Sequence, residues 1–226
     1  MVNINEKGRG QSMLGTITGS YGLGSPQAGA KCSRINYEEK GGLCAELLRL
    51  LYELSFRESG TPITLASGRK SNYYICKDAQ LSSKGMSLVG DIVYEKIKEL
   101  NVHAVGGLET GAVFIAFPTA MVARTKGKEL NVFVVRKELK GHGIPKKIDG
   151  KVEKGDKVVV VDDVMTSGES VLKAIDAAKE FGLDVVKVIV LVDRQEGGKE
   201  VIEKTRIPIE AIFTMEEILQ LHDERQ

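Results

Sequence analysis

The sequence is poor in the residues that build disulfide frameworks and membrane spans. It has no tryptophan and only three cysteines, Cys32, Cys44 and Cys76, which form no CxxC pair and cannot all be joined in internal disulfides. The longest apolar run, from residue 112 to 123, contains Pro118 and is too short to span a bilayer. The N-terminus also lacks the apolar core of a secretory signal peptide. We therefore expect a cytoplasmic protein with no membrane partner.

An excess of charge of either sign is also absent. Lys and Arg total 32 and Asp and Glu total 31, so the formal net charge is +1. A near-neutral chain lacks the broad positive field that attracts nucleic acid or anionic membranes, so neither is expected as a partner. Hydrophobic residues make up 42% of the chain and charged residues 28%, which is typical of a folded globular domain.

Glycine, by contrast, is abundant and unevenly spread. Nine of the 25 glycines fall within residues 1–42, a stretch that is also rich in serine and has no sustained apolar period. Such a composition is typical of flexible chain. We predict that residues 1–42 form a disordered extension and that residues 43–226 form one domain.

Beyond residue 42, apolar residues recur first with helical spacing and then in an alternation of strands and helices. Near-continuous β-branched runs at 158–161 and 186–192 are typical of strands covered on both faces. The pattern predicts an α/β fold with a central parallel sheet flanked by helices. Helices are expected at 43–56, 82–100, 111–124, 168–181 and 215–222, the last opening on a capping box of Thr214 and Glu217. Strands are expected as two short segments within 61–78, around a bend at Ser67 and Gly68, and at 103–108, 132–136, 157–162, 185–192 and 207–213.

A long connection from residue 137 to 156 contains little core-forming material. It carries Lys137, Lys140 and His142 beside two glycines, which suits a mobile lid that covers an anion. A solvated charged loop with no ligand fits the same composition. The composition alone leaves both interpretations open.

The clearest chemical signal is VVVVDDVMTSGES, residues 158–170. A buried strand is followed by Asp162 and Asp163 at its carboxyl end, where open parallel sheets bind ligands. The turn after them combines hydroxyl groups, a glycine and a helix start, which together hold phosphate through backbone N–H groups. The acids suit ribose hydroxyls and a cation such as Mg²⁺ between ligand oxygens, so a sugar phosphate satisfies both halves. The alternative is a pair of acids that only caps a helix or forms a turn.

Segment 158–170 resembles the 5-phosphoribosyl-1-pyrophosphate (PRPP) binding motif of the type I phosphoribosyltransferases. Three further segments narrow the resemblance to the orotate phosphoribosyltransferases. They are LASGRKSNYY at 65–74, FVVRKELKGHG at 133–143 and LVDRQEGG at 191–198. The four segments occur in family order, and the match covers about residues 43–222.

The resemblance implies an activity and an architecture. The activity is transfer of the phosphoribosyl group from PRPP to orotate, with Mg²⁺ as cofactor, giving orotidine 5′-phosphate and pyrophosphate in pyrimidine (UMP) biosynthesis. The implied architecture is the type I phosphoribosyltransferase fold, with a small N-terminal hood (about 43–80), a core (about 81–226) and a flexible catalytic lid (about 137–156). It also implies a homodimer in which the lid reaches into the partner's active site.

The resemblance further assigns roles by position. Asp162 and Asp163 match the acids that hold the ribose hydroxyls, and the turn after them matches the cradle of the 5-phosphate. Thr166 and Arg194 match orotate contacts. Mg²⁺ is expected on PRPP near the two acids, with no dedicated protein ligand. Aromatic positions beside the base are matched by Tyr73 and Tyr74. The positions matched to PRPP are Arg136, Lys137, Lys140, His142, Asp162, Asp163, Val164, Met165, Thr166, Ser167, Gly168, Glu169 and Ser170, of which Lys137, Lys140, His142, Asp162 and Asp163 are the catalytic members.

The loop after the strand at 103–108 is expected near pyrophosphate, with Gly106, Gly107 and Gly111 letting backbone amides approach it. Some family members carry Lys where Thr110 and Ala66 stand. We therefore expect the lid cations and the metal ion, rather than this loop, to neutralise the negative charge of the pyrophosphate leaving group.

Two other functions stay open. One is a phosphoribosyltransferase for another base, against which the resemblance at 65–74 and Arg194 argue. The other is a non-catalytic regulator that senses PRPP. The near-neutral charge and the retained lid cations argue against that regulator.

Overall fold

The structure, a computed structural model, describes residues 41–64, 68, 70–137 and 147–226. Nearly all of the extension expected at 1–42 therefore lies outside the described residues. No helix in the described part of the chain is long and apolar enough to cross a membrane.

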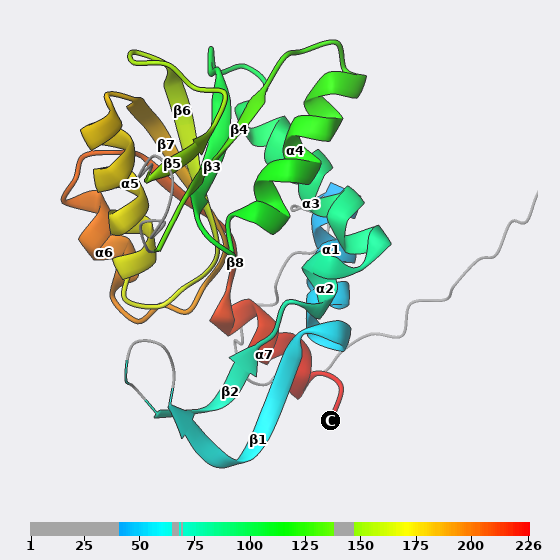
Figure 1. The fold of residues 1–226 in the computed structure, drawn as a ribbon. Coiled ribbons are helices and arrows are strands. Elements are labelled where there is room, and N and C mark those ends of the chain that lie inside the picture. Colours follow the sequence, from blue (N-terminus) through cyan, green and yellow to red (C-terminus); the bar gives the residue numbers. More distant parts are fainter. Residues whose placement is uncertain (1–40, 65–67, 69, 138–146) are drawn as a thin grey trace, which may run out of the picture. The chain divides into compact units, whose positions relative to one another are not determined.

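A six-stranded sheet forms the centre of the described domain (Figure 1). Its order is β5-β4-β3-β6-β7-β8, and all neighbours are parallel except β5, which runs antiparallel to β4. This confirms the predicted α/β fold with a mainly parallel sheet. The strands are β3 (Ala104–Leu108), β4 (Asn131–Val135), β5 (Ile148–Gly150), β6 (Lys157–Met165), β7 (Asp184–Asp193) and β8 (Ile209–Thr214).

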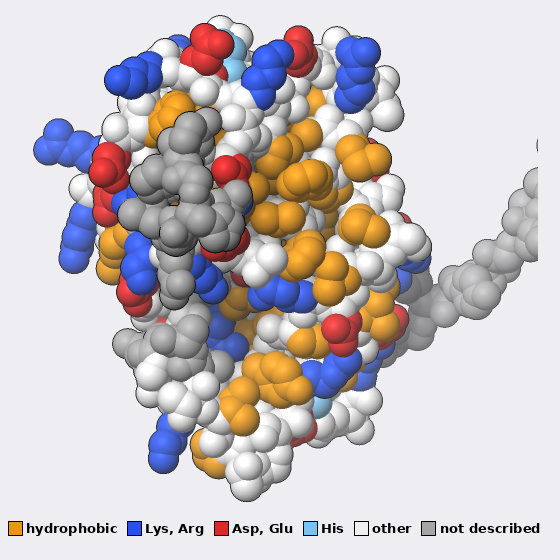
Figure 2. Space-filling model, in the orientation of Figure 1, with side chains coloured by type: hydrophobic (Ala, Val, Ile, Leu, Met, Phe, Trp, Pro, Cys, Tyr) orange, Lys and Arg blue, Asp and Glu red, His pale blue; other side chains and the backbone are white. Residues whose placement is uncertain are grey.

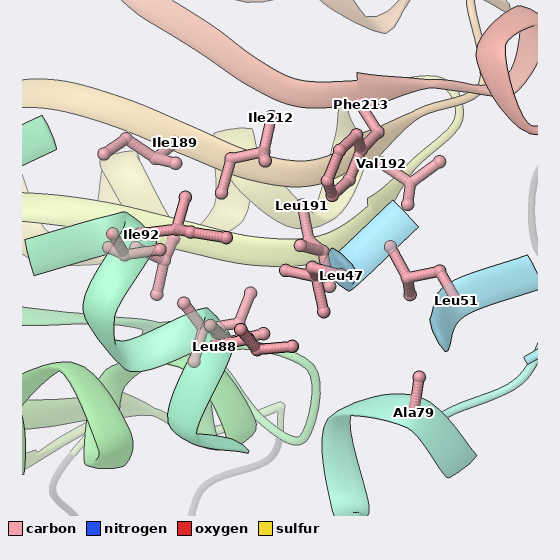
Figure 3. Close-up of a cluster of buried hydrophobic side chains, with 14 of the residues drawn as sticks. Leu47, Leu51, Ala79, Leu88, Ile92, Ile189, Leu191, Val192, Ile212 and Phe213 are labelled. Atoms are coloured by element: carbon pink, nitrogen blue, oxygen red, sulfur yellow. The ribbon is translucent and has the colours of Figure 1, made fainter. Parts of the chain in front are cut away.

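The alternation of side chains along β6 divides the core into two layers. Val159 and Val161 belong to a cluster under α1 (Gly41–Leu54), α3 (Ser83–Ile97), α4 (Val113–Thr125) and α7 (Met215–Asp223). Val158 and Val160 belong to a second cluster under α5 (Glu169–Phe181) and α6 (Gly198–Glu203). All four valines are fully buried, because a strand covered on both faces has no polar side to present. Figure 3 shows the first cluster, in which Leu47 of α1 and Ile92 of α3 lie against Leu191 of β7.

The segment expected to form the hood, about residues 43–80, contains a separate two-stranded sheet. The two strands predicted around Gly68 are present as β1 (Phe56–Thr64) and β2 (Lys70–Ile75), although β1 begins earlier than expected. The structure pairs them antiparallel. The hairpin is held to the C-terminal helix by ring contacts. The Phe56 ring lies 5.4 Å from the Tyr73 ring and 5.1 Å from the His222 imidazole of α7, centroid to centroid. Aromatic contacts of this kind add to the stabilisation from burial.

Three short elements were missed by the sequence analysis: α2 (Asp78–Leu81), β5 and α6. The strand β5 lies inside the segment 137–156 that was expected to be a lid, so residues 147–156 form part of the folded sheet edge and its following turn. Its three residues are too few to carry a strand period, and pairing with the neighbouring strand β4 decides their conformation. Residues 138–146 of the expected lid lie outside the described residues.

The predicted capping box is confirmed at the start of α7. Thr214 Oγ1 accepts a hydrogen bond from the Glu217 backbone N–H, and Glu217 Oε2 accepts one from the Thr214 N–H at 2.8 Å.

Replacing a capping Thr by Ala removes a partner from an otherwise unpaired helix N–H. We expect Thr214→Ala to lower the free energy of unfolding in urea by about 1 kcal/mol. Thr61→Ala, at an exposed position of β1, is the control and should change it by less than about 0.5 kcal/mol.

Candidate active site

A cavity of about 280 Å³ lies where the carboxyl ends of β3, β4, β6 and β7 meet the hood. Parallel strands end at the same edge of a sheet, so loops that are distant in sequence converge there. The residues that line this cavity are Tyr74, Ile75, Lys77, Leu108, Glu109, Thr110, Gly111, Lys137, Asp162, Asp163, Val164, Thr166, Ser170 and Arg194.

Two adjacent carboxylates, Asp162 and Asp163, lie at the centre of this edge. Each is only 6% exposed. Asp162 Oδ1 accepts a hydrogen bond from the Asp163 N–H at 3.0 Å, and Asp163 Oδ1 accepts one from the Val164 N–H at 2.9 Å. The acids do not cap the following helix, since the N-cap of α5 is Gly168. The capping half of the alternative, a pair that caps a helix or forms a turn, is therefore wrong.

Burial makes the ionised form of this pair costly. Desolvation, and next the charge of Asp163, raise the pKa of the Asp162 carboxyl to about 7. Hydroxyl donors or a cation delivered by a ligand would stabilise the ionised form. The pair is consequently suited to bind a partner rather than to remain empty.

Lys77 lines the cavity and is a candidate site residue that sequence reasoning missed. It follows β2, and its Nζ lies 2.5 Å from Asp163 Oδ2. No motif marks a single Lys after a hairpin, so only the folded arrangement of hood and sheet shows that it belongs to the site.

The turn after the acids forms a small second hollow of about 70 Å³, lined by Asp162 and residues 164–170. Gly168 has a φ of 81°, a left-handed conformation that other residues rarely adopt. It directs the chain into α5, whose first N–H groups have no partner within the helix. The hydroxyls of Thr166, Ser167 and Ser170 surround the same space, as a phosphate cradle requires.

The loop after β3 approaches the acids closely. A Cβ on Gly111 would lie 2.3 Å from Asp163 Oδ1 and 2.7 Å from Asp162 Oδ1, so only glycine fits there. The Glu109–Thr110 peptide bond is cis, and Glu109 Oε1 accepts a hydrogen bond from the Lys137 N–H at 2.9 Å. This loop therefore joins the acids to the start of the segment expected to be the lid.

Gly106 and Gly107 serve packing, which corrects their expected role. Both lie buried within β3. A Cβ on Gly106 would lie 1.9 Å from the Phe133 carbonyl oxygen, and one on Gly107 would lie 2.4 Å from the Val161 carbonyl oxygen. Neither residue lines the cavity.

Sequence comparison with known proteins identifies the family. The sequence profile of the phosphoribosyl transferase domain matches residues 80–219, which begin where the hood ends. An orotate phosphoribosyltransferase of Aquifex aeolicus is 42% identical over 176 residues, which cover 77% of this chain and 96% of that protein. The chain belongs to the orotate phosphoribosyltransferase family. The corresponding protein of Methanocaldococcus jannaschii is also 42% identical, over 175 residues, with 77% and 96% coverage.

Solved structures agree with this assignment. A crystal structure of Mycobacterium tuberculosis orotate phosphoribosyltransferase in complex with Fe(III) dicitrate aligns with a TM-score of 0.68 and 32% identity, covering 78% of this chain and 99% of that one. A second crystal structure of that enzyme, in complex with PRPP, aligns with a TM-score of 0.64 and 30% identity at the same coverage. The type I phosphoribosyltransferase fold is thereby confirmed.

The orotate phosphoribosyltransferase resemblance assigned Arg194, Tyr73 and Tyr74 to the base side, and the structure separates them. Arg194 and Tyr74 line the cavity. The Tyr73 ring instead stacks on Phe56, and Tyr73 is not among the residues that line the cavity, so its place beside the base stays a prediction. Tyr73 contributes its carbonyl oxygen, which accepts a hydrogen bond from Arg194 Nη1 at 3.3 Å. Alternation along β2 explains the difference, because consecutive side chains point to opposite faces.

Arg136 and Lys137, which follow the end of β4, also differ in their location. Lys137 lines the cavity, whereas Arg136 is absent from its lining and its guanidinium pairs with the Asp149 carboxylate of β5. Lys140, His142 and Ala66 lie outside the described residues. Within the described lining, Lys77, Lys137 and Arg194 supply the cationic groups, while Thr110 is neutral.

The raised Asp162 pKa predicts a pH-dependent stability. Between about pH 4 and 7 the folded protein holds a proton that the unfolded chain has released, so the free energy of unfolding falls as pH rises through this window. Asp162→Asn lacks this dependence. We expect the free energy of unfolding of the variant, relative to the unmodified protein, to increase with pH up to about 7 and then level off. The slope should not exceed about 1.4 kcal/mol per pH unit.

Urea unfolding at a series of pH values would measure this difference. Asp176→Asn, at an exposed position of α5, is the matched control. A stability difference between Asp162→Asn and the unmodified protein that stays constant with pH would contradict the assignment.

Proposed function

We propose that this protein transfers the 5-phosphoribosyl group of PRPP to orotate, forming orotidine 5′-phosphate and pyrophosphate in UMP biosynthesis. The observation that carries the proposal is the buried Asp162–Asp163 pair followed directly by the phosphate-cradle turn. The relatives named above as orotate phosphoribosyltransferases support the choice of base.

The proposed binding of PRPP follows from the order of groups along β6 and α5. The 5-phosphate lies in the turn 164–170, where backbone N–H groups and the hydroxyls of Thr166 and Ser170 donate to its oxygens. The ribose hydroxyls donate to the carboxylates of Asp162 and Asp163. This arrangement directs C1 of the ribose, with its pyrophosphate, toward the centre of the larger cavity.

Displacement of pyrophosphate from C1 develops positive charge on the sugar and negative charge on the leaving group. Cations at the leaving group therefore stabilise the transition state more than the ground state. Lys137 lines the cavity and is suited to this role. Roles for Lys140 and His142 in a closing lid, and for Arg136 toward pyrophosphate, remain predictions.

On the base side, Arg194 provides a planar cation beside Thr166 and Tyr74. Arg194 is only 8% exposed, and its guanidinium is oriented by Glu196 Oε1 at 2.9 Å and by Ser71 Oγ at 3.1 Å. A group held in this way recognises an acidic, planar base such as orotate with little loss of conformational freedom. The ring nitrogen of orotate can attack as an anion and needs no general base.

Mg²⁺ is proposed as a cofactor that PRPP brings with it. The two aspartate carboxylates offer the oxygen ligands that this ion prefers. Within the described residues no group of three acidic, His or Cys side chains could hold a metal ion, so ligand oxygens would have to complete its coordination. Bound in this way, the ion would neutralise charge on the pyrophosphate.

The function is tested by the loss of orotate absorbance with purified protein, PRPP and Mg²⁺. We expect turnover of orotate only when protein, PRPP and Mg²⁺ are all present. Asp163→Asn should fold normally, but its KM for PRPP should rise at least about tenfold, since a charged acceptor for the ribose hydroxyls is lost. Turnover of uracil, hypoxanthine or adenine in place of orotate would indicate a different base. PRPP binding without any turnover would indicate a sensor.

We also propose a homodimer as the active form. Figure 2 shows hydrophobic side chains gathered over the face that carries α3 and α4. Among large hydrophobic residues on these helices, Met86 is 39% exposed, Phe117 52% and Met121 70%. Exposed apolar surface of this kind is typical of a protein interface. The insertion of each lid into the partner's active site would require this dimer and remains a prediction. The cytoplasmic location also remains a prediction.

Met121→Glu should shift the protein from dimer to monomer in sedimentation velocity, because the substitution places a charge in the proposed interface. Lys179→Glu, on α5 at the other face of the sheet, is the control and should remain dimeric. A fully active monomer of the unmodified protein at micromolar concentration would contradict the proposal.

A further inference from the structure

The ion pair between Lys77 and Asp163 connects the hood to the central sheet inside the cavity. Lys77 lies between β2 and α2, whereas Asp163 belongs to β6. The two side chains differ in their surroundings: that of Lys77 is 43% exposed, and that of Asp163 is 9% exposed. A partly exposed cation thus pairs with a buried carboxylate.

The two oxygens of Asp163 have different partners. Oδ1 accepts the Val164 N–H at 2.9 Å, which fixes the carboxylate within β6. Oδ2 faces the Lys77 ammonium at 2.5 Å. Oδ2 is buried and accepts no other hydrogen bond in the described structure, and Lys77 covers it, so a ribose hydroxyl that binds at Oδ2 competes with Lys77.

The competition has an electrostatic basis. Asp162 and Asp163 are adjacent, and both are nearly removed from water. Gly111 packs against both, which leaves no room for a larger residue on that side. A buried pair of carboxylates is costly without a counter-ion. In the empty protein Lys77 provides that positive charge at Oδ2.

We infer that Lys77 is an exchangeable counter-ion, which pairs with Asp163 in the empty site and moves to the pyrophosphate group when the ribose hydroxyls of PRPP take its place. The inference rests on the proposed function. The lysine side chain has four flexible carbons and three N–H donors. Lys77 already lines the cavity together with Thr110 and Lys137, so a short movement transfers its ammonium from a carboxylate to a phosphate oxygen.

Loss of Lys77 is expected to affect the ribose 5-phosphate part and the pyrophosphate part of PRPP differently. Ribose 5-phosphate has the hydroxyls and the 5-phosphate but no pyrophosphate. If Lys77 is removed, ribose 5-phosphate loses no contact and meets less competition at Asp163. PRPP loses a charge-assisted contact to its pyrophosphate. A lysine that only tied the hood to the sheet would affect both ligands alike.

Lys77→Met tests this by isothermal titration calorimetry with PRPP and, separately, with ribose 5-phosphate, both in the presence of Mg²⁺. We expect the dissociation constant for PRPP to rise about tenfold, the value of one charge-assisted hydrogen bond, while that for ribose 5-phosphate stays equal or falls. Lys77→Arg keeps the charge and should restore most of the affinity for PRPP.

Lys84→Met is the matched control, because Lys84 also forms an ion pair, with Glu46 at 2.6 Å, but lies on α3 outside the cavity. Equal weakening of both ligands in Lys77→Met, or unchanged affinity for PRPP, would overturn the inference. If the unmodified protein binds neither ligand, the proposed function fails and the inference with it. Circular dichroism of each variant distinguishes these outcomes from unfolding.

Discussion

The two adjacent carboxylates at the end of β6 set the condition that the rest of the site must meet. Asp162 and Asp163 are placed almost out of water, where their charge is costly unless it is paired or hydrogen-bonded. The chain supplies two backbone N–H groups of β6 and one ammonium, from Lys77. Burial still keeps the pKa of Asp162 raised, so these partners do not fully offset the cost. The site is consequently prepared for donors that a ligand brings.

Such an arrangement needs a rigid support. Residues 158–161 of β6 are fully buried, with one cluster of the core on each face, so the strand cannot shift to relieve the acids. Two sets of polar contacts join the hood to this edge of the sheet. Lys77 pairs with Asp163, and Arg194 binds Ser71 and the Tyr73 carbonyl. Lys77, Asp163 and Arg194 all line the cavity, so a ligand that enters there meets at least one partner of each contact.

Sequence patterns predicted the parts of the structure that repeat or that lie within one segment. The buried valines of β6, the period of α5 and the Thr214 capping box each depend on neighbours in sequence, and all were predicted. The diacid and the phosphate turn were found because they occupy one stretch of 13 residues, 158–170. The strand β5 and the helix α6 were missed because elements of three and six residues carry too little period. Tyr73 and Tyr74 could be separated only after the pleat of β2 and its neighbours were known.

The location of positive charge depended on tertiary structure even more strongly. A net charge of +1 conceals a cavity whose described cations come from three distant places: Lys77 after β2, Lys137 after β4 and Arg194 after β7. Arg136, the immediate neighbour of Lys137, instead neutralises Asp149 on the strand β5 that the sequence did not reveal. These two adjacent basic residues, which both follow the end of β4, thus have different partners. In this chain, the cations that line the cavity are therefore better identified by the strand end that each follows than by a basic cluster in the sequence.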